Sequence, residues 1–99
     1  MDELRRLAAA GDTYARDQLV GLLRDRGNLD EAVAVLRRPA DSGDGWAARE
    51  LVRLLSEQGR FDEAITLMDR RATAGDEYAR HQLRVLRRRQ REQGEQAAG

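Results

Sequence analysis

The sequence repeats itself at an interval of 32 residues, and this repeat constrains the fold more than any other feature. Residues 8–39 and 40–71 align without gaps and are identical at 13 of 32 positions. A third copy begins at residue 72 and diverges after its first half. A fixed period of this length is typical of proteins built by stacking one structural unit. We therefore interpret the chain as a single repeat domain, 1–99, with a half unit at 1–7, units at 8–39 and 40–71, a partial capping unit at 72–94 and a frayed tail at 95–99.

Each unit contains two segments whose apolar residues recur on one face of a helix. In the first segment these residues are Ala15, Leu19, Leu22 and Leu23. In the second segment they are Leu29, Ala32, Val33 and Leu36 in one unit, and Phe61, Ala64, Ile65 and Met68 in the next. The pattern predicts two amphipathic helices for each unit.

Residues with known preferences for helix ends mark the boundaries of these segments. An aspartate, a favoured N-cap, precedes each copy of the first helix, at Asp12, Asp44 and Asp76. Gly27 and Gly59 follow the first helix and supply the left-handed residue that ends it. Pro39 disfavours helical geometry at the residue before it. We expect it to shorten or bend the second helix of the first unit.

Short loops make neighbouring helices antiparallel, and a helix pair this small buries its apolar surface only by stacking on the next pair. The predicted fold is all-α, a short right-handed solenoid of antiparallel helix pairs. The last helix is expected to run from Glu77 past Arg89 toward Gly94. Arg87–Arg89 replace apolar positions there, which indicates a polar cap on the last unit.

Two motifs resemble known helical repeats. Gly59-Arg60-Phe61-Asp62-Glu63-Ala64-Ile65, followed by Met68, resembles the turn and second helix of a tetratricopeptide repeat, and Gly27-Asn28-Leu29-Asp30-Glu31-Ala32 has the same pattern. Gly11-Asp12-x-x-Ala15-x-x-x-Leu19 resembles the opening of a Sel1-like repeat. The period departs from the usual length of about 34 or 36 residues. The small residue usual in the first tetratricopeptide helix is replaced by Val20, Val52 and Arg84. The resemblance implies a protein-binding or assembly scaffold.

The face of the first helix opposite Leu19 carries the candidate binding residues. In tetratricopeptide-like solenoids this face lines the concave groove, and Trp, Tyr and Arg dominate binding hot spots. The resemblance therefore implies a peptide groove, with Trp46 as its anchor, formed by Tyr14, Asp17, Arg24, Trp46, Arg49, Arg53, Tyr78, His81 and Arg88. The alternative is that the aromatic side chains fold against the preceding loop and the charges are only solvated.

A basic cluster lies near the C-terminus. It contains six of the 18 arginines, namely Arg80, Arg84, Arg87, Arg88, Arg89 and Arg91, whereas residues 1–79 carry 12 arginines against 16 acidic residues. One interpretation is a solvated helix whose cations suit its C-terminal end. A second is a site for an acidic protein, and a third is weak nucleic-acid contact through phosphates. His81 is the only ring interleaved with these arginines, which disfavours base stacking.

The ends of the solenoid are a further candidate surface. Leu4 and Leu7 belong to a half unit with no helix before it, and an uncapped end leaves apolar surface exposed. This arrangement fits a fragment of a longer array. It also fits a homo-oligomer in which the basic C-terminal end attracts the acidic N-terminal end of another copy.

Composition excludes several kinds of chemistry. Without Cys or Lys the chain has no disulfide framework, thiolate metal site, Schiff-base lysine or P-loop lysine. His81 is the only histidine, and no nucleophile accompanies it. Asp41–Gly45 lacks the spaced carboxylates of a calcium loop. We therefore expect a non-enzymatic protein with no catalytic residues, no cofactor and no metal.

The net charge of zero gives no overall attraction to nucleic acid or to anionic membranes. No segment is apolar enough to cross a bilayer, so a cytoplasmic location is the expectation. The leading hypothesis is a protein-interaction module within a larger regulatory or sensor protein, which binds a protein or peptide in the groove; an acidic partner is one form of this hypothesis. The alternatives are self-assembly through the ends and weak phosphate contact through the C-terminal arginines.

Overall fold

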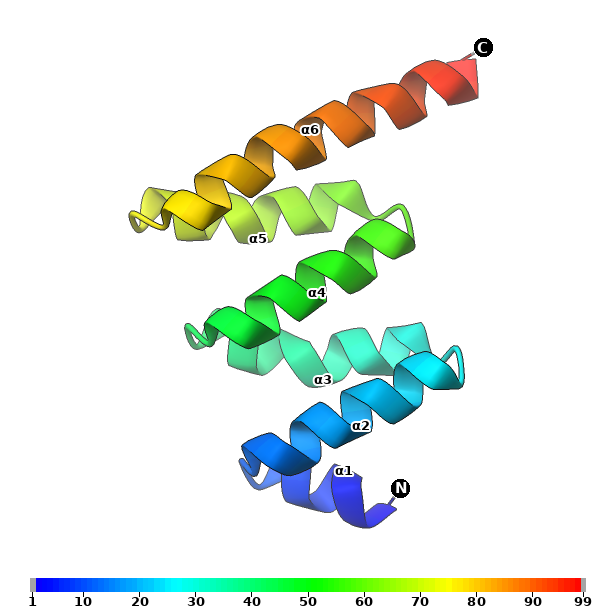
Figure 1. The fold of residues 1–99 in the computed structure, drawn as a ribbon, viewed down its shortest axis with the longest axis vertical. Helices are drawn as coiled ribbons and strands as arrows, with labels where there is room; N and C mark the ends of the chain where they lie inside the picture. The colour runs from blue at the N-terminus through cyan, green and yellow to red at the C-terminus, as the bar shows by residue number, and fades with distance from the viewer. Residues whose placement is uncertain (1, 99) are drawn as a thin grey trace. The chain divides into compact units, whose positions relative to one another are not determined.

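The structure, a computed structural model, describes residues 2–98 and the side chains of residues 2–95. Over this range the chain forms six α-helices and no strand (Figure 1): α1 (Asp2–Ala9), α2 (Thr13–Asp25), α3 (Leu29–Asp41), α4 (Gly45–Glu57), α5 (Phe61–Thr73) and α6 (Glu77–Ala98). The predicted all-α helical repeat is confirmed. The chain divides into two compact parts, Met1–Leu54 and Leu55–Gly99, which are described in turn. None of the described helices is long and apolar enough to cross a lipid bilayer.

The helix boundaries follow the local signals in the sequence. The side-chain Oδ1 atoms of Asp12, Asp44 and Asp76 accept hydrogen bonds from the backbone N–H groups three residues later, at 2.9, 3.1 and 3.2 Å. Gly27 and Gly59 follow α2 and α4 with φ angles of 77° and 72°. A side chain is strained in this left-handed region, so glycine is the residue that ends these helices without cost. The predicted caps and stops are confirmed.

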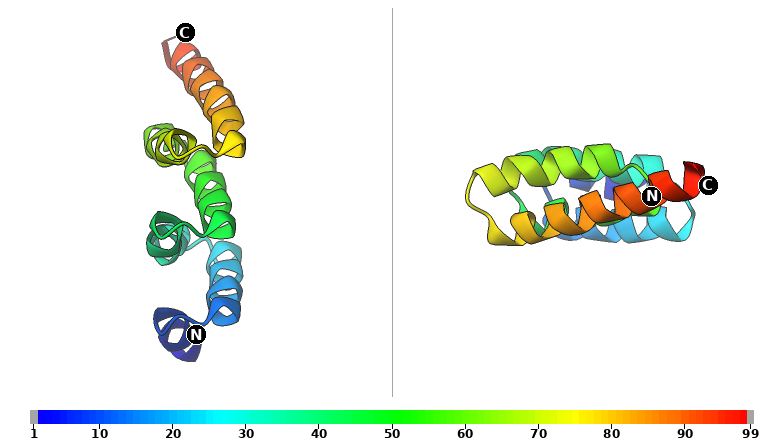
Figure 2. Two further views of the ribbon diagram at one scale, coloured as in Figure 1. Left: turned by 90° about the vertical axis from the view of Figure 1, so that its left-hand side faces the viewer. Right: turned by 90° about the horizontal axis from the view of Figure 1, so that it is seen from above.

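The N-terminal part contains two layers of helices. α1 and α3 lie in one layer, and α2 lies with the first turns of α4 in the other (Figure 2). Its core is made by leucines that are at most 1% exposed, namely Leu19, Leu23, Leu36 and Leu54. Burying one such side chain contributes about 1.5–3 kcal/mol, so these positions supply much of the packing energy.

Leu22 departs from the predicted core stripe, because its side chain is 38% exposed, whereas Leu54 at the same position of the next unit is fully buried. α1 has only eight residues and runs antiparallel to α2 from a tight turn. It spans about 12 Å at 1.5 Å per residue, and therefore reaches only the first half of α2. Leu22 lies in the second half of α2, beyond the reach of α1.

Pro39 does not shorten α3, which has 13 residues like its counterpart α5. The proline lies in the last turn of α3, where its missing N–H removes a single intrahelical hydrogen bond. The N–H of Ser42 still donates to the carbonyl oxygens of Arg38 and Pro39, so the helix end is hydrogen bonded. The expectation of a shorter helix is wrong because the proline falls too near the natural end of the helix.

In the C-terminal part, α5 and α6 pack antiparallel (Figure 1). Phe61, Met68, Leu83 and Leu86 are buried. The guanidinium of Arg89 lies over the ring of Phe61, 5.3 Å from its centroid, and Gln90 donates a hydrogen bond to Asp62. These contacts fix the second half of α6 against the start of α5.

The last helix does not end near Gly94. α6 continues through this glycine to Ala98, and Gly94 is not among the glycines with positive φ. The tail expected to fray at 95–99 is therefore helical through residue 98, while residue 99 lies outside the described residues. No proline or left-handed glycine stops the helix, and Arg91 occupies the position of the stop residues Gly27 and Gly59.

Candidate functional site

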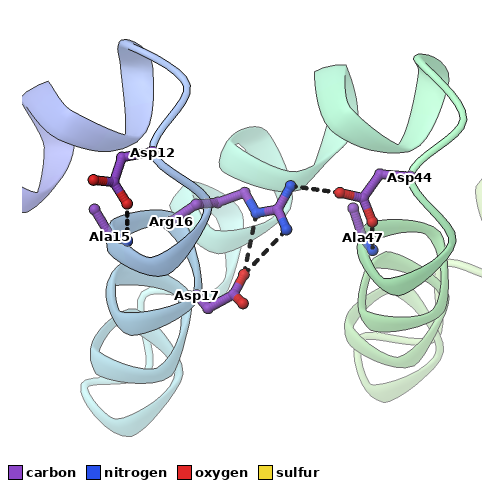
Figure 3. A network of polar contacts seen from close by, with 6 residues as sticks. All are labelled: Asp12, Ala15, Arg16, Asp17, Asp44 and Ala47. Atoms are coloured by element: carbon purple, nitrogen blue, oxygen red, sulfur yellow. Dashed lines mark hydrogen bonds and ion pairs between the residues drawn. The ribbon is translucent and has the colours of Figure 1, made fainter.

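α2 and α4 are joined by the side chain of Arg16 in the N-terminal part (Figure 3). Its Nη1 atom donates to Oδ2 of Asp44 at 2.8 Å, and its Nε atom donates to Oδ1 of Asp17 at 3.2 Å. The guanidinium also lies over the ring of Trp46, 5.1 Å from the centroid. The side chain is only 10% exposed. Arg16 therefore connects the beginnings of two successive first helices through one charged group.

The protonation of this cluster is fixed by the same contacts. Burial lowers the pKa of Arg16, but its hydrogen bonds with Asp44 and Asp17 outweigh that effect and raise the pKa above its ordinary value. The hydrogen bond from Arg16, followed by the one from the Ala47 backbone, lowers the pKa of Asp44. Both groups remain charged near neutral pH, so the bridge is a charge-assisted hydrogen bond.

Trp46, the predicted anchor, is stacked on one ring face. Its side chain is 40% exposed, with Arg16 over the ring. Tyr14 is 74% exposed, the highest value among the exposed large hydrophobic residues in the described part of the chain. We call the residues Tyr14, Asp17 and Arg24 of α2, together with Trp46, Arg49 and Arg53 of α4, the α2–α4 surface. It presents two aromatic side chains: Trp46, whose ring is held by Arg16, and Tyr14, which is largely exposed. A cation–π contact of this kind contributes about 0.5–1 kcal/mol at an exposed site.

Glu50 is a member of this surface that the sequence interpretation missed. Its carboxylate lies 3.7 Å from Nη1 of Arg24 and 3.4 Å from Nη1 of Arg53, and its side chain is 13% exposed. The signal was its place three residues before Arg53, a spacing that puts both on one helix face. Arg49 is exposed on the same helix, and Asp17 pairs with Arg16. The surface is therefore mixed in charge rather than simply basic.

The other predicted groove residues lie on α6, in the C-terminal part. Tyr78 is 42% exposed, and His81 is exposed. The side chain of Arg88 is 77% exposed, and its Nε atom lies 3.5 Å from a carboxylate oxygen of Glu92. The site described above accordingly rests on the residues of α2 and α4.

Of the arginines in the basic cluster, Arg89 contacts an aromatic ring and the other five are exposed. Arg89 faces Phe61, as described above. Arg80 is exposed at the beginning of α6, and a shallow surface hollow further along is lined by Arg84, Arg87, Arg88, Gln90 and Arg91. Arg84 and Arg87 occupy the positions of the buried residues Val20 and Leu23. The polar replacement predicted from the sequence lies on an exposed helix face.

The predicted end residues are only partly covered. Leu4 is half-buried and Leu7 is 37% exposed. α1 is held to α3 by Arg5, whose Nε and Nη2 atoms donate to the two carboxylate oxygens of Glu31 at 2.6 and 2.9 Å. The hydrogen bond from Arg5 lowers the pKa of Glu31. This end of the chain thus has a fixed helix with exposed apolar side chains.

The described residues contain no group of three or more His, Asp or Glu side chains placed to hold a metal ion. Neither the curated proteins nor the solved structures contain a match to this chain. The Sel1-like resemblance stays a prediction. A family model described as Tetratricopeptide repeat matches residues 23–88, about two thirds of the sequence. This match runs from the end of α2 through α3, α4 and α5 to the middle of α6, and the chain belongs to the tetratricopeptide repeat family.

Proposed function

We propose that this chain binds a segment of a partner protein on the α2–α4 surface of its N-terminal part, as one module of a larger regulatory or sensor protein. Tetratricopeptide repeats generally serve as non-enzymatic protein-interaction modules, which supports this class of function. The observation that carries the proposal is the pairing of the exposed ring of Trp46 with the exposed arginines Arg49 and Arg53 one and two turns further along α4.

The chemistry of the surface suits a segment with an apolar side chain and a nearby carboxylate. The open part of the Trp46 ring offers apolar contact, and Arg53 is 59% exposed. The pair between Arg53 and Glu50 is long, at 3.4 Å, and exposed pairs contribute about 0–1 kcal/mol. A partner carboxylate can therefore replace Glu50 as the partner of Arg53 at low cost.

The surface is already ordered before a partner arrives. Arg16 fixes the spacing of α2 and α4 through Asp44 and holds one face of Trp46. Ordering a free side chain on binding costs about 0.5–1.5 kcal/mol, and this cost is avoided for a ring that is held beforehand. Preorganisation therefore favours binding at this location.

The experiment is a peptide screen monitored by the fluorescence of Trp46, the only tryptophan in the chain. Short synthetic peptides with acidic and aromatic residues serve as probes. Arg49→Gln with Arg53→Gln should weaken binding at least tenfold, because both lie beside the reporter. Arg37→Gln with Arg38→Gln removes equal charge from α3 and should leave binding within about twofold. The proposal is wrong if no peptide binds, or if the α3 variant weakens binding as much as the α4 variant.

A second function is supported by the exposed arginines of α6. The hollow lined by Arg84, Arg87, Arg88 and Arg91 places several guanidinium groups on one exposed surface. Such a surface attracts phosphate or acidic protein segments, and the attraction weakens steeply with salt. Inorganic polyphosphate at low and high salt tests it, and Arg87→Gln with Arg91→Gln should abolish any salt-sensitive binding.

A further inference from the structure

The contact that joins α2 to α4 has a defined set of partners. Arg16 lies in the second turn of α2, and its guanidinium meets Asp44, the N-cap of the next first helix, and Trp46, two residues further on. Oδ1 of Asp44 caps its helix by accepting from Ala47, and Oδ2 accepts from Arg16. One carboxylate therefore serves both as helix cap and as acceptor for the preceding unit. Because the sequence repeats, each half of this contact should recur elsewhere.

The beginning of α6 reproduces the arginine side of the Arg16–Asp44 contact. Residues 72–83 are identical to residues 8–19 at nine of twelve positions, whereas residues 84–91 match residues 20–27 at two of eight. Arg80 occupies the position of Arg16. It is exposed and makes no ion pair with any residue in the described range. Residues 77–83, the first two turns of α6, thus display the surface with which α2 holds the unit that follows it.

The beginning of α2 displays the acceptor side of the same contact. Asp12 and Tyr14 occupy the positions of Asp44 and Trp46. Oδ1 of Asp12 caps α2 by accepting from the N–H of Ala15 at 2.9 Å, as Asp44 does at α4. Asp12 is exposed, and Tyr14 is 74% exposed. The ring and the carboxylate that would receive an arginine here are both open to solvent.

α1, which lies beside Asp12 and Tyr14, also fits the surface around Arg80 at the beginning of α6. Leu4 of α1 occupies the position of Leu36 in α3, which is fully buried against its unit. α1 corresponds to the second half of α3, residues 34–41, which runs beside the first half of α2. A second α1 would therefore lie beside residues 77–83 of α6, where the repeat pattern is kept. Arg84 and Arg87 follow these two turns, beyond the reach of α1.

We propose that a second copy of this chain docks with its α1 and the beginning of its α2 on residues 77–83 of α6. Arg80 of one copy donates to Asp12 of the other and lies over the ring of its Tyr14. Leu4 and Leu7 are covered against the beginning of α6. The contact is heterologous, so copies join head to tail, in a ring or an open series, instead of as a symmetric dimer.

The test uses two variants that each disable one side of the contact. Arg80→Glu removes the donor and repels Asp12. Asp12→Asn keeps an amide oxygen to cap α2 but presents an N–H group toward Arg80. Sedimentation velocity from about 1 µM to 1 mM should show concentration-dependent oligomers for the wild-type chain and monomers for each variant alone.

A mixture of the two variants is decisive. Asp12→Asn retains its own Arg80, and Arg80→Glu retains its own Asp12. An equimolar mixture should form a dimer and nothing larger, because only one productive contact remains. The proposal is overturned if the wild-type chain is monomeric throughout, if either variant associates like wild type, or if the mixture stays monomeric.

Two further variants separate this contact from general charge effects. Arg84→Glu changes the charge of α6 equally, one turn away, and should leave the oligomers within about twofold of wild type. Tyr14→Ser leaves every charge in place but removes the ring beneath the arginine, and should weaken association at least fivefold. Equal loss of association in Arg84→Glu would contradict the proposed geometry. Circular dichroism confirms that each variant is helical before its mass is interpreted.

Discussion

Arg16 shows how one residue decides the arrangement of two helices. The apolar pattern of the sequence does not single out Arg16, because arginine is rarely buried, yet its side chain is only 10% exposed. Its partner lies 28 residues away, and only the stacking of successive units brings the two together. Local patterns therefore predicted the cap role of Asp44 correctly, whereas its second role as an acceptor for Arg16 depends on tertiary packing.

Replacing Arg16 by methionine should destabilise the chain. Methionine keeps the aliphatic contact but leaves Asp44 and Asp17 without their cation. Hydrogen bonds to charged groups contribute about 1.5–3 kcal/mol, and partial exposure reduces this to about 1–2 kcal/mol here. Thermal unfolding should show a decrease of roughly 4–16 °C in Tm. Arg24→Met, which removes a longer and more exposed pair, is the control; an equal decrease in both would contradict a special role for Arg16.

Acid should weaken the Arg16–Asp44 bridge. The pKa of Asp44 is lower in the folded chain than in the unfolded chain, where it is about 3.9, so the unfolded state binds a proton first as the pH falls. The stabilisation is complete above about pH 5 and is lost as the pH falls through the folded pKa. Asp44→Asn keeps a capping oxygen but cannot titrate. The free energy of unfolding should therefore fall less between pH 6 and pH 3 in this variant than in wild type, as urea titrations can measure.

At the scale of the helix, the sequence predicted where elements begin and end better than which apolar residues they bury. The caps at Asp12, Asp44 and Asp76 act within three residues, so local chemistry decides them. Burial of Leu22 depends on the length of a neighbouring helix, which its own periodicity does not contain. The sequence interpretation also ended α6 too early, near Gly94. A glycine in a helix interior costs only about 1 kcal/mol, which the contacts of α6 with α5 offset, so the helix continues through Gly94 to Ala98.

Leu22 and Leu54 form a matched pair that tests this account. They share one position of the repeat, but Leu22 is 38% exposed and Leu54 is fully buried. Leu54→Ala should cost about 2–5 kcal/mol, since it removes buried surface and leaves a cavity. Leu22→Ala should cost less than about 1 kcal/mol, because its side chain already contacts water. Chemical denaturation measures both, and costs of similar size would show that Leu22 is covered in solution.

At the scale of the whole chain, the repeat supplies stacking surfaces, and the arginines of α6 limit where stacking continues. Val20 and Leu23 are buried where successive helices meet, while Arg84 and Arg87 present charge at the same positions. Terminal repeats need a polar outer face to remain soluble. The tetratricopeptide family match covers residues 23–88 and so includes both arginines. These two charges interrupt the apolar pattern that buries Val20 and Leu23 in the first unit.

Replacing Arg84 and Arg87 of α6 by the apolar residues found at these positions in the first unit should make the chain self-associate. Arg84→Val with Arg87→Leu adds two apolar side chains to an exposed helix face, and contiguous exposed apolar surface promotes association. The pair is introduced together with Arg80→Glu, so that the proposed contact with Asp12 does not contribute. Light scattering should show association that grows with concentration and persists at high salt, because burial of apolar surface is not screened. Arg84→Gln with Arg87→Gln in the same background removes the charge without adding apolar surface and should remain monomeric. Association of the glutamine variant would indicate that charge repulsion alone, rather than the lack of apolar surface, keeps the capped face soluble.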